Sequence, residues 1–439
     1  MAGEWKRTSL REAGVSLIDC DHRTPPAADS GYPYVAIPQL KEGRLALSDV
    51  RRISPEHFVE WTRKAKPQHH DVILSRRCNP GETAYVPEGL ECALGQNLVL
   101  LHSDGTKVFP PFLRWLLAGP DWWEQVGTFI NVGAIFNSLK CADIPNFKMP
   151  LPPLAEQKAI ASVLGALDDK IELNRRMNAT LEAMARALYQ SWFVDFDPVR
   201  AKLDGRLPGG LDAATAALFP DHLEVTALGH IPKGWTAGKL GDIGTNSRRG
   251  VQPGDIAPNT PYIALEHMPR RCIALGDWDD SAEVASGKSA FKKGDILFGK
   301  LRPYFHKVGV APFDGVCSTD ILVLAPKSPE WFGFLLGHVS SDELIQFTDL
   351  ASTGTKMPRT NWGDINSFKV ALPPKPIAAV FTRSIQPMLD RIHVNLHQSR
   401  TLATLRDSLL PKLLSGELSV AGGNPPELPD SSKLGKVSL

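Results

Sequence analysis

The chain has 439 residues, of which 43% are hydrophobic and 22% are charged, so its composition is that of a globular protein rather than a disordered or fibrous one. At this length two to four domains are expected, and a single small domain is excluded. Forty-nine Lys and Arg against 48 Asp and Glu leave a net charge of +1. Taken alone, this balance argues against a nucleic-acid-binding protein, because phosphate binding usually shows as a basic excess.

Nothing in the sequence indicates secretion or membrane insertion. The first ten residues are polar and charged, and no apolar run approaches the eighteen residues or so that a membrane-spanning helix needs. The six cysteines form no C-x-x-C pair, which argues against a zinc ribbon or a disulfide framework and for reduced thiols. We therefore expect a cytoplasmic protein with no metal site and no membrane contact.

The two halves of the chain repeat one another. Six matches occur in the same order in both halves, while their offset drifts from 230 to 221 residues, as small insertions in surface loops would produce. The matches pair Trp5 and Leu10 with Trp235 and Leu240, 33–37 with 261–265, 71–74 with 295–298, 98–100 with 322–324, Ile144 and Phe147 with Ile365 and Phe368, and 151–153 with 372–374. The sequence therefore predicts an internal duplication.

Each half has the same internal plan. Its first part is rich in β-branched and aromatic runs broken by Gly, Pro, Asn and Asp, which is typical of short strands and turns with some helix. A long segment almost free of Gly and Pro follows in the first half. We predict an α+β fold with two similar domains and two long helices. The predicted boundaries are a first domain at 1–150, a spacer helix at 151–194, a linker at 195–234 with a short helix around 212–218, a second domain at 235–372, a second spacer helix at 373–416, and a disordered tail at 417–439.

The two long segments share a heptad pattern with a polar middle. In the first, apolar and amide residues recur at alternating spacings of four and three, and adding 221 gives the second seam. We predict that the two helices pack as an antiparallel coiled coil; the alternative is two separate amphipathic helices, each lying on its own domain. Pro387 predicts a kink or a late start in the second helix. The seam positions singled out are Ile160, Leu164, Leu167, Ile171, Asn174 and Leu181 in the first helix, and Ile392, Asn395, Leu402 and Leu409 in the second.

No catalytic signature is complete. The segment 282–289 would be a phosphate-binding loop if Ala282 were glycine. Asp168 and Asp169 could belong to a nuclease metal site, but on a heptad helix they are better explained as a solvated charged face. Adjacent His69 and His70 would point to opposite faces of a strand and could not share an ion. An enzyme is therefore not the favoured interpretation.

Two similar modules joined by long helices form a geometry that can measure distance. Forty helical residues span about 60 Å, part of which is used in docking to each module. DNA half-sites on one face of the duplex recur about every 34 Å. The predicted spacer therefore suits one module per major-groove segment.

The central segment from Leu151 to Ile160, with the runs 167–171 and 191–196, resembles the central conserved region of the DNA-specificity subunits of type I restriction-modification systems. The run 228–235 resembles the start of that family's second recognition domain, and 409–416 resembles its distal helix end. The resemblance covers essentially the whole chain. The second copy departs from the central motif, because 376–378 replaces the Glu-Gln-Lys stretch.

The resemblance implies a non-catalytic subunit that binds double-stranded DNA. Each domain would recognise one half of a bipartite, asymmetric target, and the helices would set the unread gap. It also implies docking of two methyltransferase subunits, in which Glu156 and Gln157 of the central motif would take part with the seam, and of motor-endonuclease subunits. No cofactor is expected in this chain, whereas S-adenosylmethionine is expected in the partner methyltransferase. A scaffold that joins protein partners without binding DNA is the rival interpretation.

Neither domain is basic in bulk: residues 1–150 carry 17 Lys and Arg against 17 Asp and Glu, and residues 235–372 carry 15 against 15. Any binding of phosphate must therefore come from local clusters of cationic residues. Loops after predicted strands supply cations, amides and aromatics that can contact bases or phosphates. The DNA-binding candidates are Arg76, Arg77, Asn79, Asn131 and Asn137 in the first half, and Arg248, Arg249, Lys300, Arg302, Tyr304, Lys307, Thr355, Lys356 and Arg359 in the second. Ordinary surface charge is the alternative for each of them.

Overall fold

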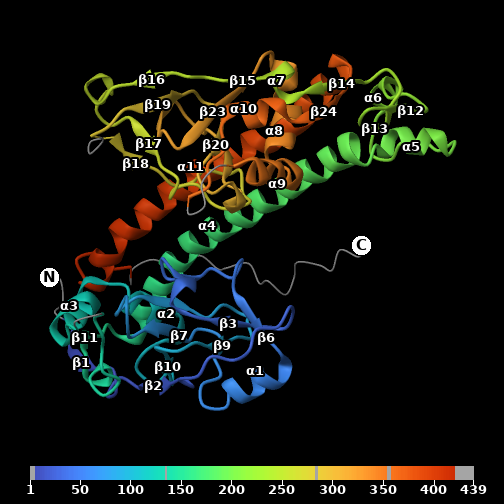
Figure 1. Ribbon diagram of the computed structural model, residues 1–439. Helices are drawn as coiled ribbons and strands as arrows, with labels where there is room; N and C mark the ends of the chain where they lie inside the picture. The colour runs from blue at the N-terminus through green and yellow to red at the C-terminus, as the bar shows by residue number, and fades with distance from the viewer. Residues whose placement is uncertain (1–4, 134–135, 282–284, 353–356, 421–439) are drawn as a thin grey trace. The chain divides into compact units, whose positions relative to one another are not determined.

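The computed structural model describes residues 5–133, 136–281, 285–352 and 357–420. It divides the chain into two compact units, one made of residues 1–169 and 402–439, the other of residues 170–401. Each unit combines sheets with helices, so the fold is mixed α and β as predicted (Figure 1). The predicted disordered tail lies, from residue 421 onward, outside the described residues.

The first unit is built on a four-stranded antiparallel sheet. Its order is β2 (Val15–Asp19), β10 (Leu98–Ser103), β7 (Val72–Ser75) and β8 (Thr83–Tyr85). A second sheet has the order β6 (Arg51–Ile53), β3 (Tyr32–Val35) and β9 (Ala93–Leu94), in which β3 and β9 are parallel. The remaining elements are the pairs β1 (Arg7–Ser9) with β11 (Lys148–Pro150) and β4 (Leu40–Lys41) with β5 (Arg44–Leu45), and the helices α1 (Pro55–Trp61), α2 (Pro110–Leu116) and α3 (Pro120–Phe129).

The second unit contains a sheet of the same order, followed by a larger one. The first is β15 (Gly244–Asn246), β23 (Ile321–Pro326), β20 (Ile296–Gly299) and β21 (Val308–Val310). The larger sheet is β16 (Gly250–Val251), β19 (Lys288–Phe291), β22 (Gly315–Cys317), β17 (Pro261–Ile263) and β18 (Asp279–Asp280), with β17 and β22 parallel. The other elements are β14 (Thr236–Lys239) paired with β24 (Lys369–Leu372), α7 (Leu240–Ile243), α8 (Phe332–Val339), α9 (Asp342–Ala351) and α10 (Trp362–Ser367).

The strand order therefore repeats together with the sequence. An aspartate at the start of β7 and of β20 shows the same local device in both units. Asp71 accepts a hydrogen bond from the Gln68 amide at 2.8 Å, and Asp295 accepts one from the Lys292 amide at 2.8 Å. An aspartate that closes a turn in this way fixes where the following strand begins.

The apolar strands of each unit face packed cores. In the first unit β7 is buried along its whole length, since it lies inside the sheet and is covered on both faces. The largest cluster of the second unit is rich in aromatic side chains: the Phe193 ring meets Phe334 and Phe381 edge-to-face, with centroids 4.8 and 4.9 Å away. Such edge-to-face contacts are favourable beyond the buried area alone.

Two long helices run through the residues of both units. Helix α4 spans Leu154–Tyr189, has 36 residues and continues as a single π-helical turn at Gln190–Val194 (η3). Helix α11 spans Lys375–Leu414 and has 40 residues. Of the two alternatives predicted from Pro387, a kink or a late start, the late start is wrong, because α11 begins twelve residues before that proline and its helical assignment is continuous through it.

Within the second unit the polar middle of the seam joins α4 to α11. The Asn174 side-chain amide donates to Gln398 Oε1 at 2.9 Å and to Ser399 Oγ at 3.2 Å. The Asn395 amide donates to Asn178 Oδ1 at 2.8 Å. These two helix segments are therefore antiparallel, and the 174–399 pair maps onto the 395–178 pair under the 221-residue repeat.

The apolar seam residues are buried to different degrees. Ile160, Leu164 and Ile392 are fully buried. Leu167, Ile171, Leu181, Leu402 and Leu409 are half-buried. In the first unit, Ile160, Leu164 and Leu413 belong to one core cluster, and Leu409 packs against that cluster. The seam there is therefore continuous with the core of the unit.

The segment predicted to be a linker is part of the second unit. It forms α5 (Asp197–Leu203), α6 (Ala213–Leu218) and the hairpin β12 (Leu223–Thr226) with β13 (Gly229–Pro232). Phe196, Phe219 and Ile231 are buried in the aromatic cluster. The sequence predicted α6. It did not predict that Phe196, Phe219 and Ile231 are buried, because they are isolated apolar residues among turn residues.

Replacing Asn395 with alanine is expected to lower the free energy of unfolding of the second unit by about 1–2 kcal/mol, because the buried Asn178 Oδ1 would lose its hydrogen bond. Denaturant unfolding of the full chain, followed by tryptophan fluorescence, measures the change. Thr180→Ala on the exposed face of α4 is the control and should be nearly neutral. Equal losses in both variants would mean that the polar pair adds nothing specific.

Candidate nucleic-acid interface

The two candidate loops of the first unit lie against each other. The loop after β7 is fixed by the Arg76 amide, which donates to the Asn97 carbonyl at 3.0 Å. The Leu139 amide donates to the Arg76 carbonyl at 2.8 Å, and Arg77 forms a β-bridge with Ser138. The segments 76–79 and 136–139, which are far apart in the sequence, are thus joined by backbone contacts.

The second unit repeats this arrangement. The Lys300 amide donates to the Asp320 carbonyl at 2.9 Å, and the Thr360 amide donates to the Lys300 carbonyl at 3.0 Å. Leu301 forms a β-bridge with Arg359. These contacts are the repeat counterparts of those at Arg76, so both units bring the same two loops together by the same backbone hydrogen bonds.

A cleft of about 650 Å³ opens beside the joined loops of the second unit. Among the described residues that line it are four cationic side chains and no carboxylate. Converging cations in a concave surface produce a local positive potential even where the net charge is near zero. The cations are Arg248, Lys288, Lys300 and Arg359, and the polar lining includes Asn246, Ser247, Gln252 and Asn361.

The cleft gathers three of the predicted DNA-binding cations: Arg248, Lys300 and Arg359. Arg248 and Arg359 are exposed, and Lys300 is half-buried. Arg359 also lies 3.4 Å from a carboxylate oxygen of Asp320, which offsets part of its charge. An exposed or half-buried cation in such a cleft can meet a phosphate with little loss of hydration.

Other candidates of the second unit are placed differently. Arg249 is half-buried and forms an ion pair with Asp295 at 3.1 Å, so its charge is largely balanced by a carboxylate of the same unit. The Lys307 ammonium donates to the Leu265 carbonyl, and burial, followed by the charge of Arg270, lowers the pKa of Lys307. The prediction that Lys307 contacts DNA is therefore not supported by its position. Tyr304, by contrast, is 48% exposed.

Arg302 is half-buried and has a left-handed backbone, with φ of 51°. Its guanidinium lies 5.8 Å from the centre of the Phe305 ring. Thr355 and Lys356, the remaining candidates of this unit, lie outside the described residues.

In the first unit the cationic candidates are Arg76 and Arg77. The Arg77 guanidinium lies 5.6 Å from the centre of the exposed Phe136 ring, and Arg76 is half-buried. Asn79 is exposed and donates to Glu82 at 3.3 Å.

The two remaining candidates of this unit lie on the second loop. Asn137 is exposed, whereas the Asn131 side chain donates weakly to the Phe129 and Ser138 carbonyls. The two units thus share a backbone frame but present different side chains on it.

Sequence reasoning missed Lys288. It is mostly buried, its ammonium donates to Ser286 Oγ at 2.7 Å, and it lies 5.4 Å from the centre of the Tyr262 ring. No local signal marks it, because it lies in the segment that fails the phosphate-loop pattern. Only pairing between strands β16 and β19 brings it beside the cleft.

Glu156 and Gln157 of the central motif are buried inside the first unit. Gln157 Oε1 accepts from the Phe109 amide at 2.8 Å, and its Nε2 donates to the Lys107 and Pro152 carbonyls at 2.8 Å each. Glu156 accepts from the Val420 amide at 3.2 Å. The prediction that these two side chains form a docking surface is therefore wrong: they tie the start of α4 to its own unit.

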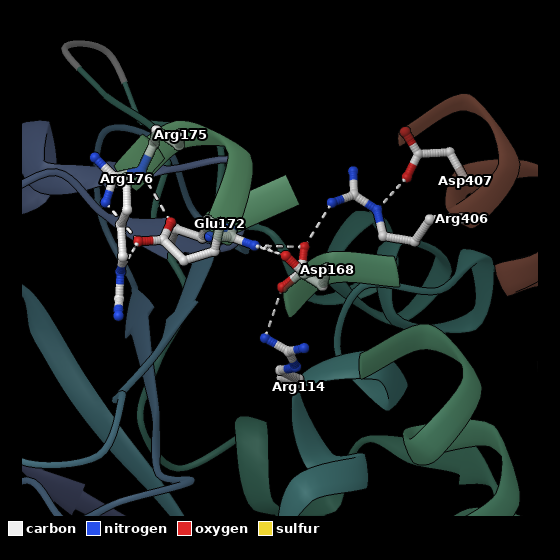
Figure 2. Close-up of polar contacts among 8 residues, drawn as sticks. Arg114, Asp168, Glu172, Arg175, Arg176, Arg406 and Asp407 are labelled. Atoms are coloured by element: carbon white, nitrogen blue, oxygen red, sulfur yellow. Dashed lines mark hydrogen bonds and ion pairs between the residues drawn. The ribbon is translucent and has the colours of Figure 1, made fainter. Parts of the chain in front are cut away.

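Asp168 is the buried centre of a group of ion pairs (Figure 2). The prediction that it lies on a solvated charged face is therefore wrong. Its carboxylate lies 2.8 Å from Arg44, 2.9 Å from Arg114 and 2.9 Å from Arg406, which come from β5, α2 and α11. Burial raises the pKa of this carboxyl, but the charges of Arg114, Arg44 and Arg406 together bring it below its ordinary value. All four residues belong to the first unit.

One group of three possible metal ligands occurs among the described residues: Asp19, Cys20 and His22. The two ring nitrogens of His22 face different partners, with Nε2 3.0 Å from Asp19 and Nδ1 3.9 Å from Cys20 Sγ. Burial raises the pKa of the Cys20 thiol to about 11, and the thiol donates to the Gly95 carbonyl. One ligand atom from each of the three residues lies within 4.8 Å of the others.

His69 and His70 lie in a turn rather than in the strand assumed from the sequence. Their rings stack with centroids 3.6 Å apart. Burial, followed by the charge of His69, lowers the pKa of His70 to about 4. The rings therefore face each other, and the argument from opposite strand faces does not apply.

The described helices include none that is both long and apolar enough to cross a bilayer. The fold and the joined loops define a class: a duplicated protein in which two related mixed α and β units present variable polar loops and share two long helices.

Residues 22–183 match the type I restriction modification DNA specificity domain. The chain is 28% identical over 365 residues to the type I restriction enzyme MjaIX specificity subunit of Methanocaldococcus jannaschii, which covers 80% of this chain and 78% of that one. It is 25% identical over 401 residues to the HindI specificity subunit of Haemophilus influenzae, which covers 79% and 86%. The crystal structure of the type I restriction-modification S subunit from M. genitalium has the same fold, with a TM-score of 0.50 and 15% identity over 93% of this chain and 96% of that one.

The chain is thus similar over most of its length to specificity subunits of type I restriction-modification systems. The resemblance that the central motif indicated is confirmed.

Proposed function

We propose that this chain is the non-catalytic, DNA-recognising subunit of a type I restriction-modification enzyme, and that each unit recognises one half of a bipartite target in double-stranded DNA. The observation that carries the proposal is the pair of joined loops, which recurs in both units with equivalent backbone hydrogen bonds and different side chains. A duplicated frame with different exposed residues is what recognition of two unlike half-sites requires.

Within the second unit, different residues contact the DNA backbone and the bases. Arg248, Lys300 and Arg359 line the cleft and contact the DNA backbone, because each carries a charge toward a concave surface without a carboxylate among its described residues. Exposed Tyr304 and half-buried Arg302 lie on the neighbouring turn and contact bases. Since neither unit is basic in bulk, tight binding requires the complex with partner subunits.

The long helices set the gap between the half-sites and dock two methyltransferase subunits. In this assignment methylation and its donor, S-adenosylmethionine, belong to those partners, and cleavage belongs to motor-endonuclease subunits that join the complex. The names of the relatives, which are specificity subunits of restriction enzymes, support this division of labour.

A gel-shift series at increasing salt tests the proposal. The purified chain with its methyltransferase subunits is incubated with a library of duplexes in which every position is randomised, and bound DNA is sequenced. Enrichment of a bipartite motif, with affinity that falls steeply with salt, supports DNA recognition, because phosphate binding releases counterions. A scaffold that only joins protein partners would enrich no motif and show no such salt dependence.

Inserting one heptad into each long helix is expected to lengthen the unread gap while both half-sites stay the same. Seven residues add about 10.5 Å of helix, which corresponds to roughly three base pairs. The same library selection measures the gap. Insertion of a whole heptad keeps the seam residues in register, so the altered chain is expected to fold. A changed half-site sequence with an unchanged gap would contradict the spacer function.

A further inference from the structure

Glu182, on the α4 part of the second unit, is buried and holds one short segment of that unit. Its Oε1 accepts from the Cys272 thiol at 3.2 Å and from the Ala274 amide at 3.1 Å. Its Oε2 accepts from the Ile273 amide at 3.0 Å. The three donors all come from residues 272–274, so one carboxylate fixes the position of this segment against α4.

The segment held by Glu182 is attached to the loop that carries Tyr304. The Arg271 amide donates to the His306 carbonyl at 2.9 Å, and the Val310 amide donates to the Ile273 carbonyl at 3.0 Å. Upstream, the Arg270 guanidinium lies 4.0 Å from the centre of the Phe305 ring. A shift of the segment would therefore move the loop.

This loop needs support from outside itself. Its short 3-10 helix, η6 (Pro303–Phe305), is flanked by Arg302 and His306, both with left-handed backbones, at φ of 51° and 49°. Side chains other than glycine adopt this conformation at a cost in free energy, and they keep it only when their surroundings hold them there. The supports on His306 are the Arg271 amide on its carbonyl and the Ser340 carbonyl 3.0 Å from its Nε2.

We infer that Glu182 is a positioning residue: a carboxylate on the long helix that fixes, through residues 271–274, the loop with which the second unit contacts bases. Glu182 itself is buried and would touch no DNA. The inference rests on the proposed function, because the loop has a specific task only if the unit recognises DNA.

A carboxylate is chemically suited to this position. Three donors face it, and both of its oxygens accept. A glutamine would place an N–H against at least one of these donors while keeping nearly the same volume. The repeat position in the other half of the chain is Ala403, so this carboxylate has no acidic counterpart there. Loss of Glu182 should therefore affect one half-site and spare the other.

The first test needs no DNA. Hydrogen exchange of the full chain is compared for wild type, Glu182→Gln, Cys272→Ala and the exposed-surface control Glu224→Gln. Faster exchange at 302–307, larger in Glu182→Gln than in Cys272→Ala, is expected, because the glutamine takes the acceptor from at least one backbone amide and sets an N–H against it, whereas the alanine removes only the thiol donor. Unchanged exchange at 302–307 in Glu182→Gln would overturn the inference. Cys272→Ala keeps the test valid if the glutamine variant does not fold.

The second test measures discrimination. Each variant, in complex with the methyltransferase subunits, selects from the randomised duplex library. Glu182→Gln is expected to lose roughly tenfold in discrimination at one half-site and nothing at the other. Equal loosening of both half-sites, or of neither, would overturn the inference. If the wild-type complex enriches no motif, the proposed function itself fails, whereas the exchange data still decide whether Glu182 positions the loop.

Discussion

Replacing Asp168 with asparagine is expected to destabilise the first unit by about 3 kcal/mol. The carboxylate is almost fully buried, and the side chains of Arg44, Arg114 and Arg406 are only 24%, 16% and 18% exposed. Removing the shared anion leaves three cations close together without their common partner. Denaturant unfolding of the full chain, with the fraction unfolded followed by far-ultraviolet circular dichroism, measures the loss.

Asp407→Asn is the matched control for Asp168→Asn. Asp407 is 62% exposed and pairs with Arg406 from the solvent side at 2.8 Å. An exposed pair of this kind contributes about 0–1 kcal/mol. If the two variants lose the same stability, the buried centre is no more important than a surface pair.

The Asp168 centre also predicts a dependence of stability on pH. The pKa of Asp168 is lowered in the folded chain from an ordinary value of 3.8, since the three arginines outweigh the effect of burial. Its stabilisation is fully present above that ordinary value and is lost as the pH falls through the lowered one. Unfolding midpoints of wild type and Asp168→Asn should therefore converge only in strong acid.

The double variant Lys300→Ala, Arg359→Ala is expected to weaken binding of the selected duplex by roughly tenfold or more and to reduce the salt slope by up to about 1.8 if each cation meets one phosphate. Both residues line the same cleft, and their backbones lie on the two loops that the Thr360 amide joins. The measurement is the dissociation constant of the methyltransferase complex as a function of salt.

A charge-matched control separates the cleft from the overall charge. Lys239 and Lys369 face each other across β14 and β24, are both exposed and do not line the cleft. Lys239→Ala with Lys369→Ala removes the same two charges and should leave affinity within about twofold, because neither lysine lines the cleft and salt screens exposed charges. Equal losses in the two double variants would remove the cleft from the interface.

The candidate site could be found only partly from the sequence. The sequence predicts that Lys300 and Arg359 contact DNA, and both line the cleft. Lys307 has the same local pattern, yet its ammonium is turned inward onto a backbone carbonyl. Local charge patterns do not distinguish these cases, since the direction of a side chain depends on what packs beneath the loop.

The sequence by itself determined the duplication, the two long helices and the polar middle of their seam. These features are periodic, so residues close in the chain, or separated by one fixed offset, carry the signal. Asn174 and Asn395 could be recognised as equivalent before any contact between helices was known.

Only the tertiary structure decided which polar residues work inside the units. Asp168, Gln157 and Glu182 are three polar residues of one helix. Each is buried because its partners come from distant segments: arginines from three elements for Asp168, the Phe109 amide and the Lys107 carbonyl for Gln157, and the amides of 273–274 for Glu182. The physical reason is that burial of a polar group depends on whether long-range packing supplies it with hydrogen-bonding partners, which no local pattern specifies.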